Sequence, residues 1–180
     1  AIIMAAFGCN FEGDIPPARV IALARYARDI CAECGRPLPQ LFLADTMGWA
    51  NPDAVRRLVD EVRKAVPDTR IGLHLHDTRG LGAANVLAAL DAGVDLFDSS
   101  VAGLGGCPFA AHGDRGAAGN ICTEDMVFLC HEMGIETGID LEALVECARL
   151  AERIIGRKLN GHVMHAGTLA GYRAKQAAAA

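Results

Sequence analysis

Short apolar runs alternate regularly with longer amphipathic runs along this chain. Four short runs, each followed within a few residues by a glycine-containing turn, predict strands at residues 2–7, 41–44, 71–75 and 96–99. Five longer runs carry apolar residues at helical spacing and predict helices at residues 18–34, 52–65, 81–92, 123–133 and 141–155. Asn51 before Pro52 is typical of a helix N-cap, and Gly93 and Gly134 stand where helices end.

This alternation favours parallel strands, because parallel neighbours need a connection long enough to hold a helix. Two α/β architectures fit, an open doubly wound sheet and a (β/α)8 TIM barrel. A doubly wound nucleotide-binding sheet usually has a glycine-rich loop after its first strand, and residues 7–13 lack that spacing. We therefore expect a barrel, of which four strands are half, since complete barrels run to about 250 residues.

The expected organisation is a single domain over residues 1–176. It would supply about the last four βα units of the barrel and the C-terminal helices, with a tail at residues 177–180. The chain starts in a predicted strand at Ala1, without an initiator methionine, which agrees with a truncated barrel whose front half is missing.

Composition limits the kinds of binding partner and the cellular compartment that we expect for this protein. The net charge is −5 at pH 7 with no block of like charges, which argues against nucleic acid and against a basic membrane-binding face. No apolar stretch reaches the roughly 18 residues of a membrane span, and the start does not resemble a signal peptide. Seven cysteines at irregular spacing indicate reduced thiols, with Cys31 and Cys34 as buried helix thiols. We expect a cytoplasmic protein, or a mitochondrial matrix protein in a eukaryote.

The sharpest motif is a pair of histidines at the end of the third predicted strand, His74 and His76, followed by Asp77. Because successive side chains of a strand alternate between faces, the two imidazoles point the same way. They lie at the carboxyl end of the strand, where a barrel keeps its active site. Metal ligation is therefore favoured over two core histidines that are satisfied by hydrogen bonds.

Three further segments carry groups that suit a catalytic cleft. Cys107 lies in a glycine-rich loop after the last predicted strand, where it can reach a substrate, although a loop cysteine can also have no function. Asp45 follows the second strand and fits a general acid or base, although such residues are more often turn caps. Asn120 offers an amide oxygen to a cation or forms a turn.

Taken in order, these motifs resemble the 3-hydroxy-3-methylglutaryl-CoA lyase branch of the metal-dependent barrel lyases and aldolases. The resemblance runs from residues 7–13 (FGCNFEG) through HLHD and GLGGCP to residues 136–141 (ETGIDL). It implies that His74, His76 and Asn120 bind a divalent cation, Mg²⁺ or Mn²⁺. It also makes Cys107, Asp45 and His74 the catalytic residues, with Thr46 and Lys158 binding the acyl-CoA substrate.

The implied reaction is cleavage of a 3-hydroxyacyl-CoA, such as 3-hydroxy-3-methylglutaryl-CoA to acetoacetate and acetyl-CoA, by a homo-oligomer, expected to be a dimer, of the complete barrel. The alternatives are a condensing enzyme or aldolase of the same superfamily, similar to isopropylmalate or citramalate synthase, and a non-catalytic half-barrel. The family's first-strand Arg-Asp pair and a later Glu are expected in the front half.

The sequence departs from the usual family pattern at several positions. Asn10 replaces the proline of FGCPYEG, Phe42 stands where a serine is common, and residues 111–115 lengthen the loop after Cys107. The remaining histidines, His112, His131, His162 and His165, lack ligand spacing and are expected to be surface or local hydrogen-bonding residues.

Overall fold

A computed structural model gives the fold, and it describes residues 1–106 and 119–179. The chain divides into two compact units. The first comprises Ala1–Asp98 and Gly106–Asn120, and the second comprises Ser99–Gly105 and Ile121–Ala180.

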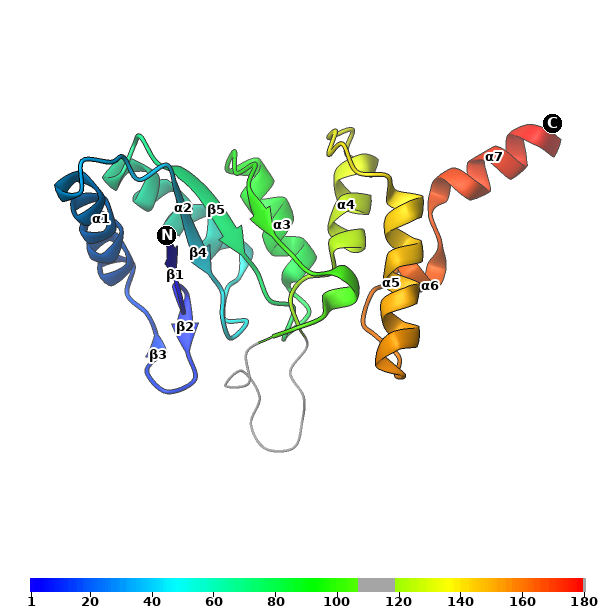
Figure 1. The fold of residues 1–180 in the computed structure, drawn as a ribbon, viewed down its shortest axis with the longest axis horizontal. Coiled ribbons are helices and arrows are strands. Elements are labelled where there is room, and N and C mark those ends of the chain that lie inside the picture. Colours follow the sequence, from blue (N-terminus) through cyan, green and yellow to red (C-terminus); the bar gives the residue numbers. More distant parts are fainter. Residues whose placement is uncertain (107–118, 180) are drawn as a thin grey trace. The chain divides into compact units, whose positions relative to one another are not determined.

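The first unit is built on a parallel sheet, as the alternation predicts. Its strands lie side by side in the order β1-β4-β5-β6 (Figure 1), and they are β1 (Ile2–Ile3), β4 (Gln40–Ala44), β5 (Arg70–His74) and β6 (Phe97–Asp98). Strand β1 is shorter than the predicted run at 2–7, because the backbone turns at Ala5, where φ is 51°. A positive φ is incompatible with a continuing strand.

A two-stranded hairpin follows β1, and the apolar pattern does not predict it. It consists of β2 (Gly8–Cys9) and β3 (Gly13–Asp14), and Figure 1 shows it beyond the end of β1. A Cβ atom on Gly8 would lie 2.5 Å from the ring of Trp49, so the hairpin approaches that ring as closely as only a glycine allows. Strands of two residues are too short to show alternation.

Three helices connect the strands of this unit, namely α1 (Pro17–Glu33), α2 (Pro52–Ala65) and α3 (Gly82–Asp91). Helix α2 has the predicted bounds, since the Asn51 side chain accepts a hydrogen bond from the Ala54 amide at 3.0 Å. Leu41, Leu43 and Leu73 of the sheet are fully buried, and each contributes roughly 1.5–3 kcal/mol of hydrophobic stabilisation.

The expectation of two buried thiols on α1 is wrong. Cys31 is half-buried and Cys34 is exposed at the C-cap, and the buried residues of the helix, Val20 and Ala24, lie in its first half. The six cysteines that the structure describes form no disulfide, as predicted.

The second unit is helical. It contains the 3₁₀ turn η1 (Val101–Gly103), α4 (Thr123–Glu132), α5 (Leu141–Ile155), α6 (Val163–Ala166) and α7 (Leu169–Ala179). Helices α4 and α5 match their predicted runs within one residue, whereas α6 and α7 were not predicted. Residues 177–179, expected to belong to a tail, are the end of α7. The core of the second unit contains buried residues from η1, α5 and α6, including Ala102, Val145 and Met164.

Over the described part of the chain, none of the helices combines the length and the apolar character that a membrane crossing requires.

Candidate active site

The two histidines of the HLHD motif meet at the end of β5. Their Nε2 atoms are 3.1 Å apart, and the ring planes are inclined by 62°. His76 is buried and His74 is half-buried, so both imidazoles lie in a sheltered position with a route to solvent at His74. The convergence follows from strand alternation, which places residues 74 and 76 on one face. Burial and the neighbouring His74 lower the pKa of His76, which favours the neutral, ligating form of its ring.

Asp98, at the end of β6, lies beside this pair. Its Oδ2 is 3.2 Å from Nδ1 of His74, and the two residues are register partners in the sheet. The contact is one of charge and proximity, since Nδ1 of His74 makes no hydrogen bond. A carboxylate beside one imidazole nitrogen favours a ring orientation in which the other nitrogen binds a ligand. Sequence reasoning missed Asp98, although its position at a predicted strand end was the available signal.

Asn120 lies next to His76, as the proposed ligand set requires. The two residues form an isolated antiparallel bridge, and the Asp77 amide donates to the Gly119 carbonyl at 3.2 Å. The Asn120 side chain, acting as a hydrogen-bond acceptor, shifts the pKa of His76 in the raising direction, against the stronger effect of burial. The chain therefore returns to the end of β5 after the segment 107–118.

Asp45 lies at the end of the neighbouring strand, β4. Its Oδ1 accepts hydrogen bonds from the amides of Trp49 at 2.7 Å and Ala50 at 3.1 Å, whereas its Oδ2 is buried without a hydrogen-bond partner. Its own amide donates to the His74 carbonyl at 2.8 Å. Burial raises the pKa of Asp45 to about 6. The carboxylate therefore caps a turn with one oxygen, while its other oxygen is buried without a hydrogen-bond partner. A catalytic role of Asp45 stays a prediction.

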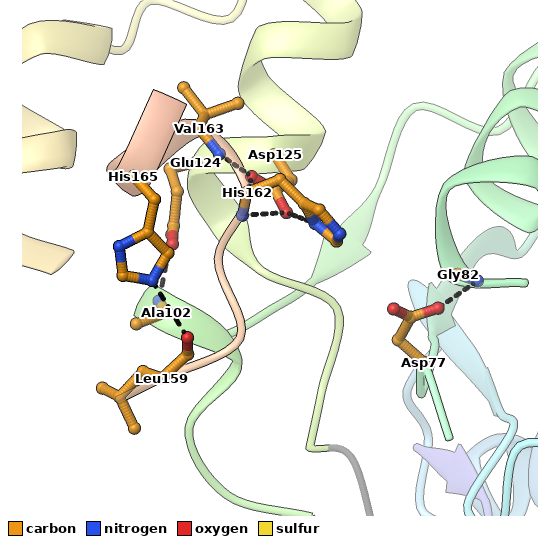
Figure 2. Close-up of polar contacts among 9 residues, drawn as sticks. All are labelled: Asp77, Gly82, Ala102, Glu124, Asp125, Leu159, His162, Val163 and His165. Carbon is orange, nitrogen blue, oxygen red and sulfur yellow. Dashed lines mark hydrogen bonds and ion pairs between the residues drawn. The ribbon is translucent and has the colours of Figure 1, made fainter. Parts of the chain in front are cut away.

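Thr46 and Asp77 use their side chains to hold the backbone. The Thr46 hydroxyl accepts a hydrogen bond from the Ala5 amide at 2.8 Å, which supports the sharp turn after β1. Asp77 accepts a hydrogen bond from the Gly82 amide at 2.7 Å at the start of α3 (Figure 2). The carboxylate of the HLHD motif thus caps α3 from the preceding loop, in place of the N-cap residue Leu81, which makes no side-chain cap hydrogen bond. A role of Thr46 in substrate binding stays a prediction.

Phe42, one of the departures from the family pattern, is accommodated by a glycine. It pairs in register with Gly72, and a Cβ atom on Gly72 would lie 2.8 Å from the Phe42 ring. Alternation along β5 places Gly72 on the same face as His74. The large side chain of Phe42 on β4 therefore lies opposite a residue without a side chain, Gly72 on β5.

The spacing of the donors at the strand ends is compatible with an octahedral divalent cation. Two neighbouring ligands of an octahedral ion with bonds of about 2.1 Å lie about 3.0 Å apart, close to the spacing of the two Nε2 atoms, which also suits a hydrogen bond between the rings. Within residues 1–106 and 119–179, no three His, Cys, Asp or Glu side chains converge as a metal site. The two imidazoles and the Asn120 amide would thus supply only part of an octahedral shell.

Two predicted site residues lie outside the described part of the first unit. Cys107 belongs to the segment 107–118, which lies outside the described residues, as does His112. Lys158 belongs to the second unit, where it is exposed and lines a cavity of about 740 Å³ together with residues 159–162, 165 and 166.

The other described histidines make hydrogen bonds within the second unit; those of His131 and His165 are local, as expected, whereas the partner of His162 is 37 residues away. The partner of His131 is Thr137, that of His162 is Asp125, and that of His165 is the Leu159 carbonyl (Figure 2 for the last two).

Sequence reasoning also missed Glu124, a fully buried carboxyl group in the second unit. Its Oε2 accepts a hydrogen bond from the Ala102 amide at 3.0 Å (Figure 2), and its Oε1 is buried without a hydrogen-bond partner. Burial raises the pKa of Glu124. Its position in the first turn of α4 gave no signal, because acidic residues are common there for their interaction with the helix dipole.

Comparison with known proteins gives a consistent family assignment. The model of the family described as HMGL-like matches residues 2–151. (R)-citramalyl-CoA lyase of Chloroflexus aurantiacus is 43% identical over 165 residues, which are 92% of this chain and 49% of that protein. Mitochondrial hydroxymethylglutaryl-CoA lyase of Mus musculus is 38% identical, over 91% of this chain and 47% of that protein.

Comparison with solved structures gives the same family. An HMG-CoA lyase from Acinetobacter baumannii, in complex with coenzyme A and 3-methylmalate, matches with a TM-score of 0.80 and 42% identity, over 93% of this chain and 52% of that one. The chain spans about half the length of the relatives and structures that it matches. Its parallel sheet and helices are therefore part of a TIM barrel, as predicted, and the chain belongs to the HMGL-like family.

Proposed function

We propose that the whole protein containing this chain is a divalent-metal-dependent carbon–carbon lyase that cleaves a 3-hydroxyacyl thioester of coenzyme A. The observation that carries the proposal is the convergence of His74 and His76, with Nε2 atoms 3.1 Å apart, at the strand edge that also holds Asn120 and Asp45. The names of the relatives, hydroxymethylglutaryl-CoA lyase and citramalyl-CoA lyase, support the reaction class.

His74, His76 and Asn120 would hold the cation, Mg²⁺ or Mn²⁺, through imidazole nitrogens and an amide oxygen. Asp98 would keep the His74 ring oriented for this purpose, since it lies 3.2 Å from the other nitrogen of that ring. When bound, the ion would supply a positive charge that acidifies the substrate hydroxyl and stabilises developing negative charge on oxygen.

The proton of the substrate hydroxyl would pass to Asp45, with His74 as the second candidate base. Asp45 suits this step because its buried Oδ2 is unpartnered and its pKa is about 6. As the hydroxyl oxygen forms a carbonyl, the bond between C2 and C3 breaks and its electron pair moves into the thioester enolate. The thiol of Cys107 would then protonate the enolate carbon, giving a ketone and the shortened thioester.

The proposed substrate is a 3-hydroxyacyl-CoA, with 3-hydroxy-3-methylglutaryl-CoA as the first candidate. It would yield acetoacetate and acetyl-CoA, with Lys158 binding the CoA moiety and Thr46 the acyl portion. The 43% identity to (R)-citramalyl-CoA lyase makes citramalyl-CoA a specific second candidate. We also propose that the complete barrel assembles as a dimer and that residues 1–176 form the C-terminal half of the barrel domain.

The test is a cleavage assay on the purified whole protein with both thioesters, in Mg²⁺, in Mn²⁺ and after treatment with EDTA. We expect cleavage of one thioester, loss of activity with EDTA, and a loss of about 10²-fold or more in the His76→Ala variant. His131→Ala is the control, because that histidine makes only a local hydrogen bond to Thr137. Metal-independent cleavage, or condensation in place of cleavage, would contradict the proposal.

A further inference from the structure

Trp49, the single tryptophan of the chain, connects the hairpin to the loop that follows β4. Its Nε1 donates a hydrogen bond to Oδ1 of Asn10 at 2.8 Å, across 39 residues of sequence. The amide of Asn10 in turn lies 3.1 Å from Sδ of Met47. The loop between β2 and β3 is thereby joined to the strand-end loop at two atoms of Asn10.

The indole ring has close neighbours besides Asn10. Gly8 packs against it with no room for a side chain. The guanidinium carbon of Arg79 lies 5.9 Å from the ring centroid, within the range of a cation–π interaction. Nη1 of Arg79 also donates to the carbonyls of Met47 and Gly48, both at 2.9 Å. Arg79 therefore links the loop after β5 to the loop after β4.

This arrangement leads directly to Asp45. The backbone amide of Trp49 donates a hydrogen bond to Oδ1 of Asp45 at 2.7 Å. Trp49 therefore contacts the carboxylate through its backbone and Asn10 through its indole. Between them, Gly48 has a φ of 65°, and a Cβ atom there would lie 2.6 Å from the Thr78 side chain. The loop has little freedom, and a shift of the indole would be transmitted to the amide that orients the carboxylate.

We infer that Asn10, Trp49 and Arg79 form a clamp that positions Asp45 for proton transfer. This inference rests on the proposed lyase function, in which Asp45 is the catalytic base and the three clamp residues act only through it. A displacement of about 1 Å in a catalytic group can lower the rate by about 10²-fold, so a clamp of this kind has a measurable effect on turnover.

The clamp also accounts for Asn10, where the family pattern usually has proline. Proline has neither a backbone N–H nor a side-chain acceptor, so it could make neither of the contacts that Asn10 makes with Met47 and Trp49. Asn10 and Trp49 therefore function as a matched pair in this chain.

A double-mutant cycle in the whole protein tests the pair. Asn10→Ala and Trp49→Phe each remove the hydrogen bond of the indole, and Trp49→Phe keeps an aromatic ring beside Gly8. We expect each variant to lower kcat about 5- to 10-fold with KM within about twofold, and the double variant to lose no more than either single one. Asn10→Asp, which keeps an acceptor, should retain kcat within about twofold.

The arginine has a matched control on the same unit. Arg79→Lys keeps the positive charge but loses the planar group, and we expect it to lower kcat about 3- to 5-fold. Arg25→Lys is the control, since Arg25 is exposed on α1, outside the clamp.

A second readout does not depend on activity. In protein labelled with 5-fluorotryptophan, the ¹⁹F resonance of residue 49 is assigned by its loss in Trp49→Phe. We expect Asn10→Ala and Arg79→Lys to shift this resonance and Arg25→Lys to leave it unchanged. A resonance that is unmoved in both clamp variants would show that the clamp does not exist in solution.

The two proposals fail in different ways. A shifted resonance with kcat unchanged would overturn the positioning role while leaving the lyase proposal intact. A wild-type protein that cleaves neither thioester would overturn the lyase proposal and, with it, the positioning role, and the ¹⁹F shifts would then report on the clamp only as a structural contact.

Discussion

The two units each bury a carboxyl group in a similar way, yet the surroundings differ. Asp45 in the first unit is 1% exposed and Glu124 in the second is fully buried. Each accepts backbone hydrogen bonds through one oxygen and leaves the other buried without a hydrogen-bond partner. Burial raises the pKa of both.

The difference lies in the elements that surround the two carboxyl groups. Asp45 lies at a strand end, where its amide donates to the His74 carbonyl of the neighbouring strand. Oε1 of Glu124 packs against Gly161 within its own unit, and the charge of the neighbouring His165 acts on the pKa of Glu124. A buried carboxyl with a raised pKa is therefore a poor indicator of catalysis by itself. Its neighbours decide whether it transfers a proton or holds a loop.

The largest effect is expected from Asp45→Asn. This change keeps the shape and the contacts of Oδ1 but removes the proton acceptor, so kcat of the whole protein should fall about 10²-fold or more. The unfolding temperature should change little, because the turn amides remain satisfied. Steady-state kinetics and thermal unfolding measure the two effects. Retained turnover would show that Asp45, like Glu124, has only a structural role.

The next largest effect is expected from Gly161→Ala in the second unit. The added methyl group would collide with Oε1 of Glu124 and lie 2.9 Å from Sδ of Met164, so the free energy of unfolding should fall by about 1–3 kcal/mol. Gly171→Ala is the control, since a Cβ atom there meets nothing within 4 Å. Denaturant unfolding measures both variants, and equal stability of the two would show that Glu124 is not packed against Gly161.

A third carboxylate, Asp77, serves as a reference for a purely structural role near the site. Asp77→Ala removes the cap of α3 and should lower the free energy of unfolding by about 1 kcal/mol, with turnover within about threefold of the wild type. A loss of turnover comparable to that of Asp45→Asn would show that Asp77 acts in the chemistry.

The smallest effect concerns pH. Because burial raises the pKa of Glu124 in the folded state, its stabilising contribution is complete below the unfolded pKa of about 4.5 and is lost as pH rises through the folded pKa. Glu124→Gln should therefore reduce the loss of stability above that pH, by less than about 1.4 kcal/mol for each unit by which the pKa is raised. Urea unfolding across the pH range measures the slope, with exposed Glu136→Gln as the control. An unchanged slope would show that Glu124 does not titrate with folding.

Much of the fold follows from local patterns. The bounds of α2 and α5 agree with the predicted runs, because each helix starts at a capping side chain, Asn51 or Asp140. The hairpin and α6 were not predicted, since segments of two to four residues carry too little periodicity. Helix α7 was not predicted either, and it begins after a turn at Gly167, where φ is 81°.

The candidate site divides in the same way. Strand alternation alone places His74 and His76 on one face, and their rings converge as expected. The contribution of Asp98 and the link from Asn10 to Trp49 could not be predicted, because each joins residues that are far apart in the sequence.

The sequence by itself determined the alternating architecture and the pairing of two imidazoles at a strand end, because backbone periodicity depends only on neighbouring residues. Tertiary structure decided that Asp45 stands beside those imidazoles while Asp77 caps a helix and Glu124 supports a turn. The reason is physical: the role of a carboxyl group depends on burial and on the partners that packing brings to it from distant segments.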